Sequence, residues 1–127
     1  MRRAMKKWIL AAAAATILLG LNGCHFTEKI NALTVENVAP SMVKDGTYEG
    51  AESILPVSAD VRVTVAAGRI TSIAMISSSH GPGHGADAIL DRVVAKQSLE
   101  VDAVSGATYS SKVVRKAIEN ALEKGVP

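Results

Sequence analysis

The sequence predicts an α+β domain in which two helices pack on one face of a small antiparallel sheet. Apolar and polar residues alternate through residues 57–65, a turn and a second strand-like segment follow, and apolar residues then recur at helical spacing in two later segments. Strands that precede helices along the chain are typical of α+β folds. A chain of 127 residues leaves room for one modest domain.

The strands are predicted from period-two patterning and turn residues. Residues 57–65 place five apolar side chains on one face and polar side chains on the other, which indicates one buried and one solvated face. Ala67-Gly68 supplies a turn, and residues 69–76 continue as the partner strand of a hairpin. Residues 47–51 predict an earlier strand of the same sheet.

Two amphipathic helices are predicted after a glycine-rich break. The first covers about residues 85–97, and the second begins near Ser110 and Ser111, either of which can supply its N-cap. Gly125 is predicted to end the second helix. The apolar positions are Ala86, Ile89, Leu90, Val93 and Val94 in the first helix, and Val113, Val114, Ala117, Ile118, Ala121 and Leu122 in the second.

The N-terminal segment has the pattern of an export signal. Basic residues precede an apolar stretch over residues 8–21, which is shorter than the roughly 20 residues of a membrane-spanning helix. Removing residues 1–23 takes away four of the 14 basic residues and none of the 12 acidic ones, so the formal charge changes from +2 to −2. Because binding nucleic acid needs a clustered basic face, a nucleic-acid partner is disfavoured. The basic residues are Arg2, Arg3, Lys6 and Lys7.

The sole cysteine defines the type of signal. Leu21-Asn22-Gly23-Cys24 resembles the lipobox of bacterial lipoproteins, in which the leader is cut before an acylated cysteine. The alternative is an ordinary secretion signal or a short uncleaved anchor, with Cys24 incidental. Either interpretation places the domain on the extracytoplasmic side of a bacterial membrane. In the lipoprotein interpretation, several acyl chains would hold it stably at the membrane surface. We therefore expect a signal peptide over residues 1–23, a lipid-anchored tether over residues 24–44 and the folded domain over residues 45–127.

The segment between the two predicted helices carries the candidate chemistry. Six of the ten residues 102–111 have a side-chain hydroxyl or carboxylate, and Gly106 lets the backbone turn and approach a ligand closely. Thr108 lies just before the predicted helix, whose unpaired N–H groups and dipole favour an anion such as phosphate. From these residues alone, the segment is either an anion site with two hydroxyls in reach or a capped loop.

A resemblance to a known family bears on this choice. Residues 102–108, Asp-Ala-Val-Ser-Gly-Ala-Thr, resemble the flavin attachment sequence of the FMN-binding domain family. That family occurs in the flavin-carrying subunits of membrane ion-pumping redox complexes and in small secreted or lipid-anchored proteins. The likeness covers about residues 45–123. The other matching stretches, in order, are residues 45–50, 68–73 and 80–85, Gln97-Ser98 and the final helix.

The resemblance implies that an FAD-dependent flavin transferase attaches FMN to Thr108 through a phosphoester. Thr108 would offer the attacking hydroxyl, and Gly106 and Ala107 would keep the loop slim enough to enter the transferase. Asp102 would assist recognition or metal placement during transfer, or it is a turn-forming carboxylate. Ser105 would hydrogen-bond the attached phosphate, or it stabilises the turn.

The implied function is electron transfer. Tyr48 and Tyr109 are the only aromatic residues of the folded part, so little surface is available to enclose a flavin, and a covalent link prevents its loss. Tyr109 either stacks on the flavin ring or anchors the helix in the core. We predict a membrane-tethered FMN electron carrier with unidentified redox donor and acceptor proteins. The alternative is a noncatalytic regulatory or ligand-binding lipoprotein that binds FMN reversibly or not at all.

Other chemistries fit the sequence less well. His80 and His84 have the spacing of a helical metal site, but the surrounding glycines and Pro82 disfavour a helix there. Ser105 lacks the leading glycine of a nucleophile elbow, and the loop lacks the Gly-Lys-Ser/Thr ending of a P-loop. We therefore expect no metal site and no catalytic residue of an independent enzyme.

Overall fold

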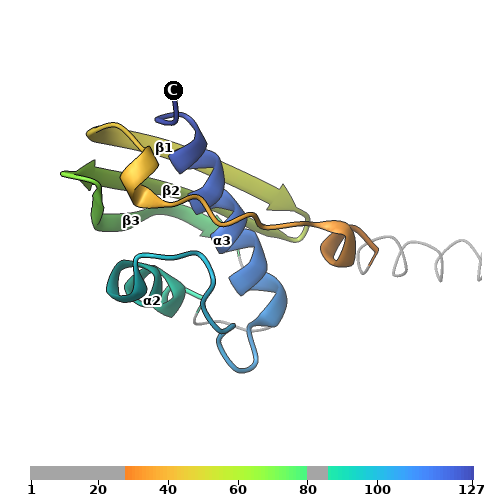
Figure 1. The fold of residues 1–127 in the computed structure, drawn as a ribbon. Helices are drawn as coiled ribbons and strands as arrows, with labels where there is room; N and C mark the ends of the chain where they lie inside the picture. The colour runs from red at the N-terminus through yellow and green to blue at the C-terminus, as the bar shows by residue number, and fades with distance from the viewer. Residues whose placement is uncertain (1–27, 80–85) are drawn as a thin grey trace, which may run out of the picture. The chain divides into compact units, whose positions relative to one another are not determined.

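A computed structural model describes residues 28–79 and 86–127. The chain divides into two units, Met1–Ala32 and Leu33–Pro127. Residues 28–32 form a short helix in the first unit. The predicted signal peptide, Cys24, His80 and His84 lie outside the described residues. None of the described helices has the length and apolar character needed to cross a membrane. The second unit contains η1 (Pro40–Met42), β1 (Gly46–Ile54), β2 (Val57–Ala66), β3 (Arg69–Ser79), α2 (Ala88–Lys96) and α3 (Thr108–Glu123) in this order (Figure 1).

The strands pair in the antiparallel order β1-β2-β3, which confirms the predicted α+β class. The inward residues of the central strand β2 are at most 2% exposed, as the period-two pattern predicts. Ala67 and Gly68, with φ of 53° and 73°, form the turn between β2 and β3. Positive φ at both central residues matches the twist of a two-residue hairpin, and Oδ1 of Asp45 accepts the N–H of Ala67 at 2.9 Å. The inward residues are Val57, Ala59, Val61, Val63 and Val65.

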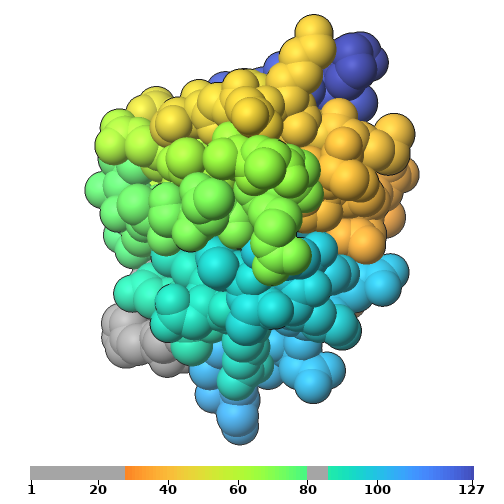
Figure 2. Space-filling model, turned by 60° about the vertical axis from the view of Figure 1, so that its left-hand side comes forward, coloured from red at the N-terminus to blue at the C-terminus, as the bar shows by residue number. Residues whose placement is uncertain are grey.

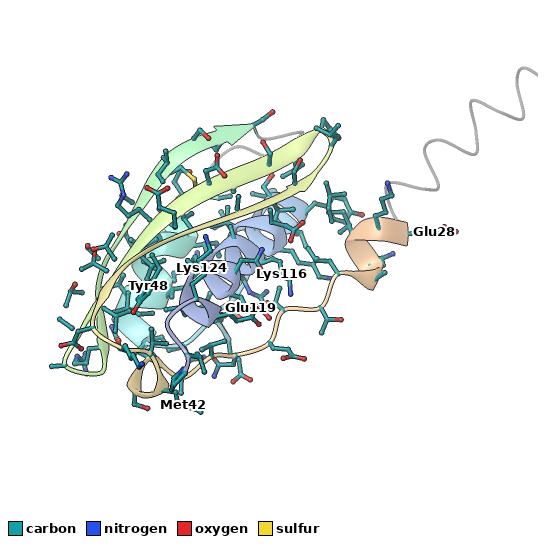
Figure 3. All side chains as sticks on the ribbon, turned by 90° about the horizontal axis from the view of Figure 1, so that it is seen from above. Glu28, Met42, Tyr48, Lys116, Glu119 and Lys124 are labelled. Atoms are coloured by element: carbon teal, nitrogen blue, oxygen red, sulfur yellow. The ribbon has the colours of Figure 1, made fainter. Side chains whose placement is uncertain are left out.

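Helix α3 packs across β1 and β2, as Figures 1 and 3 show from two directions. Gly50 in β1 permits this close packing, because a Cβ there would lie 2.2 Å from the carbonyl oxygen of Ala117 and 2.4 Å from the amide nitrogen of Ala121. Both obstructing atoms belong to the helix backbone and cannot rotate away. The buried apolar residues of α3 are Val113, Val114, Ala117, Ile118, Ala121 and Leu122.

The segment before β1 belongs to the same compact unit as the sheet. The predicted tether extends to residue 44, whereas the compact unit starts at Leu33. Val43 is 4% exposed, and the N–H of Lys44 donates to the carbonyl of Gly125 at 3.0 Å. Helix α3 ends at Glu123, and a Cβ on Gly125 would lie 2.6 Å from Cγ1 of Val43. The residues just before β1 and those just after α3 are therefore packed against each other.

Helix α2 lies beside β3 and is attached to it through Gln97. Gln97 has a left-handed backbone, with φ of 55° and ψ of 39°, which ends α2. Its side-chain amide pairs with Ile70 as a neighbouring strand would: Oε1 accepts the N–H at 2.7 Å and Nε2 donates to the carbonyl at 2.8 Å. Nε2 also donates to the carbonyl of Val94 at 2.7 Å. Gln97 thus joins the sheet, α2 and the loop that follows.

Replacing Gln97 with Ala is expected to lower the free energy of unfolding by about 2 kcal/mol, because the backbone groups of Ile70 and Val94 lose partly buried partners. Urea denaturation measures this loss. Gln97→Glu replaces the donor by a carboxylate oxygen that faces the carbonyl oxygens of Ile70 and Val94, so it should be at least as destabilising as Gln97→Ala. Equal stability of all three proteins would contradict the role of the amide.

Candidate functional site

The candidate site is the motif loop, residues 97–107, together with the first turn of α3. In Figure 1 this loop extends between α2 and α3 at one end of the second unit. The side chains of Asp102, Ser105 and Thr108 are exposed, whereas Ala107 is buried. The motif therefore presents its hydroxyls and carboxylate to solvent while one small residue anchors it to the core.

A tight turn precedes Thr108. The N–H of Ala107 donates to the carbonyl of Val104 at 2.9 Å, and Gly106 between them has a φ of 79°. A Cβ on Gly106 would meet nothing within 4 Å, so backbone conformation rather than space favours glycine. The turn is consistent with the slim acceptor loop that the sequence predicts.

Helix α3 begins earlier than predicted. Its first residue is Thr108, and the preceding Ala107 provides no side-chain cap. The prediction that Ser110 or Ser111 caps the helix is wrong, because both residues lie inside the helix and are buried. The helix start therefore has no side-chain cap of its own, and the positive end of its dipole lies at Thr108.

The two serines have different environments. Oγ of Ser111 accepts the N–H of Val104 at 3.1 Å and so ties the turn to the helix. Oγ of Ser110 is buried and has no hydrogen-bond partner among the described residues. Buried hydroxyls are usually paired, and within residues 28–79 and 86–127 this one is not, which distinguishes Ser110 from Ser111.

A broad hollow of about 490 Å³ lies beside the motif loop. In Figure 2, α2 and the residues that follow it form a surface that lies below the β2–β3 hairpin. The hollow is lined by Arg92, Ala95, Lys96, Val101, Asp102, Ala103 and Ser105.

Tyr109 follows Thr108 and is 43% exposed. The alternative in which Tyr109 anchors the helix in the core is therefore wrong. Stacking of its ring on a flavin stays a prediction.

The base of the loop is held by a residue that the sequence analysis did not single out. Oδ1 of Asn37 accepts the N–H of Leu99 at 3.0 Å and lies 3.4 Å from the hydroxyl oxygen of Ser98. Asn37 lies in a segment without periodicity, and no sequence signal links it to residues 98 and 99. The contact shows that the segment preceding the sheet supports the site.

Comparison with known proteins places these features in a family. The family model described as "FMN-binding domain" matches residues 58–123, which is more than half of the 127-residue chain. The chain belongs to the FMN-binding domain family. The match extends from β2 to the end of α3 and includes the complete motif loop.

A curated relative of this FMN-binding domain is an uncharacterized protein of Treponema pallidum (strain Nichols). It is 28% identical over 104 residues, which are 80% of this chain and 29% of the relative. The chain thus spans less than a third of that relative's length. No solved structure matches the chain.

The residues at the start of α3 suit the phosphate of FMN. Thr108 is exposed and carries a hydroxyl, and the helix start has no side-chain cap. Hydroxyls and the positive end of a helix dipole are the groups that favour a phosphate. We therefore regard Thr108 and the first turn of α3 as the candidate site of this FMN-binding domain.

A second polar cluster lies further along α3. Carboxylate oxygens of Glu36, Glu119 and Glu123 lie within 4.8 Å of one another, and Glu119 is 1% exposed. Oε2 of Glu119 lies 3.0 Å from Nζ of Lys116 (Figure 3). This distance is that of an ion pair, but the two groups are not oriented for a hydrogen bond. Contact with Glu119 raises the pKa of Lys116, and partial desolvation opposes this. Lys116 therefore offsets the buried negative charge.

Lys116→Met is expected to lower the free energy of unfolding by about 2 kcal/mol at pH 7, because it leaves the buried Glu119 carboxylate unpaired. The double variant Lys116→Met/Glu119→Gln should regain much of the lost free energy of unfolding, because it has no carboxylate at residue 119. The pKa of Lys116 is raised in the folded state. The ion pair therefore contributes its full stabilisation of the fold at pH values below the ordinary lysine pKa, and this contribution is lost as the pH rises through the raised pKa of Lys116. Chemical denaturation at pH 7 tests the substitutions, and unchanged stability of Lys116→Met would contradict the pairing.

Proposed function

We propose that this chain is a lipid-anchored electron-transfer protein that carries FMN covalently on Thr108, on the extracytoplasmic face of a bacterial membrane. The observation that carries the proposal is the exposed Thr108 hydroxyl at the uncapped start of α3, within a motif that resembles the family's attachment sequence. FMN supplies one- and two-electron redox chemistry when it is bound.

The attachment reaction is a phosphoryl-type transfer from FAD. Oγ of Thr108 forms a bond to the phosphorus on the riboflavin side of the diphosphate. The bond from this phosphorus to the bridging oxygen breaks, AMP leaves, and the hydroxyl proton passes to a base of the transferase. Such transfers depend on positioning and charge neutralisation, which a separate FAD-dependent transferase would provide.

The residues of the loop would prepare Thr108 for this reaction and hold the product. The Gly106 turn leaves Thr108 at an exposed position that a second protein can reach. Asp102, also exposed, would be recognised during transfer. After attachment, the helix dipole and the hydroxyl of Ser105 would stabilise the phosphate.

The openness of the site supports a role in electron transfer. The exposed motif loop would leave an attached flavin accessible to a redox partner. A covalent link also prevents loss of the cofactor outside the cytoplasm, where it is not easily replaced. The export pattern of residues 1–23 and the lipobox-like sequence before Cys24 support a membrane-attached location.

The proposal is tested by exporting the full chain in bacteria with and without an FAD-dependent flavin transferase. We expect flavin fluorescence on the denatured protein band, and a mass increase of one FMN less water, only when the transferase is present. Bound FMN that leaves on denaturation would favour the reversible FMN-binding alternative. Absence of any flavin would contradict the proposal.

A further inference from the structure

Three basic side chains outside the motif donate to backbone carbonyls of the motif loop. Nη1 of Arg92 donates to the carbonyl of Asp102 at 2.8 Å, and Nζ of Lys96 donates to that of Glu100. Nε of Arg115 donates to the carbonyl of Leu99 at 3.1 Å. Both flanking helices therefore hold the loop through charged donors, which make stronger hydrogen bonds than neutral ones.

Arg92 has the closest relation to the motif. Its partner Asp102 is the first residue of the attachment sequence, and both residues line the hollow beside the loop together with Ser105. Arg92 is exposed, while α2 packs through its buried residues Ile89 and Val93. The core of the domain therefore does not require the guanidinium group.

We propose that Arg92 is a positioning residue for flavin attachment: it fixes the Asp102 end of the motif loop so that the loop meets the transferase already ordered. This inference rests on the proposed attachment to Thr108. The opposite end of the motif is fixed separately, by the hydrogen bond from Val104 to Ser111 and by the buried Ala107. Thr108 thus follows a loop that is held at two points.

Loss of the Arg92 contact should affect recognition more than chemistry. A loop that is loose in the free protein must be ordered when the transferase binds it, and this cost weakens binding. The cost is equal for the bound ground state and the transition state, so KM for the acceptor protein rises while kcat stays near its original value. Arg92 itself does not touch the reacting atoms in this account.

The test measures initial rates of covalent FMN incorporation against the concentration of full-length acceptor, with purified transferase and saturating FAD. For Arg92→Gln we expect KM to rise about five- to tenfold, as loss of one solvent-exposed hydrogen bond implies, with kcat within about twofold. Arg92→Lys keeps a cationic donor and should recover part of the increase. The matched control is Arg62→Gln, which removes an exposed cation that pairs with Glu49 on the sheet.

Hydrogen exchange of the protein without flavin provides a second readout. In Arg92→Gln the amides of the motif loop should exchange faster, while those in the middle of α3 stay protected. Wild-type and Arg92→Gln proteins with equal KM would overturn this inference alone. A fall in kcat at unchanged KM would also overturn it, since Arg92 would then act in the chemical step. A wild-type protein that takes no flavin would contradict the proposed function, and the inference with it.

Discussion

Replacing Thr108 with Ala is expected to reduce covalent flavin on this chain to the level seen without the transferase. The substitution removes the oxygen that forms the phosphoester, and no rearrangement of the loop can restore it. Because Thr108 is exposed at the first position of α3, where Ala is compatible with a helix, stability should change by less than about 0.5 kcal/mol. Flavin fluorescence of the denatured band and intact mass measure the loss.

Two matched variants show whether the effect is chemical. Thr108→Ser retains a hydroxyl and should still accept FMN, although at a lower rate. Ser72→Ala removes an exposed hydroxyl of β3, outside the motif loop, and should leave attachment in place. Covalent flavin that persists in Thr108→Ala would show that another residue is the acceptor.

Gly50→Ala is expected to cause the largest loss of stability, about 3 kcal/mol or more in the free energy of unfolding. The added Cβ would lie 2.2 Å from the carbonyl oxygen of Ala117 and 2.8 Å from Cβ of Ala121. Relief requires α3 to move away from β1, and the buried contacts between them would be lost. Urea or thermal denaturation measures the difference.

Ser53→Ala is the matched control for Gly50→Ala, because it alters an exposed residue of the same strand. It should change stability by less than about 0.5 kcal/mol. If Gly50→Ala were equally mild, close packing of α3 on β1 would not be a requirement of this fold. Displacement of α3 should also impair flavin attachment, since Thr108 is the first residue of that helix.

The hydrophobic patterning predicted most of the architecture. Alternation in residues 57–65 and helical spacing in residues 113–122 identify β2 and α3, because each pattern reports which side chains of a regular element are buried. The Ala67-Gly68 turn followed from local residue preferences. Element ends were less accurate: β3 extends to Ser79, and α3 begins at Thr108 rather than near Ser110.

The motif likewise identified Thr108 and its neighbours as the candidate site, but not the residues that hold them. Asn37 binds Leu99, Arg92 binds Asp102, and Ser111 binds Val104 instead of capping the helix. Each contact joins a side chain to a backbone group of another segment.

The sequence by itself therefore determined the fold class, the periodic elements and the candidate motif of residues 102–108. Only the tertiary structure decided where α3 begins, that Leu33 to Lys44 belongs to the compact unit, and how the motif loop is held. The physical reason is the range of the interactions. Burial recurs along a regular element and leaves a period in the sequence, whereas a polar contact between distant segments forms only when packing brings them together.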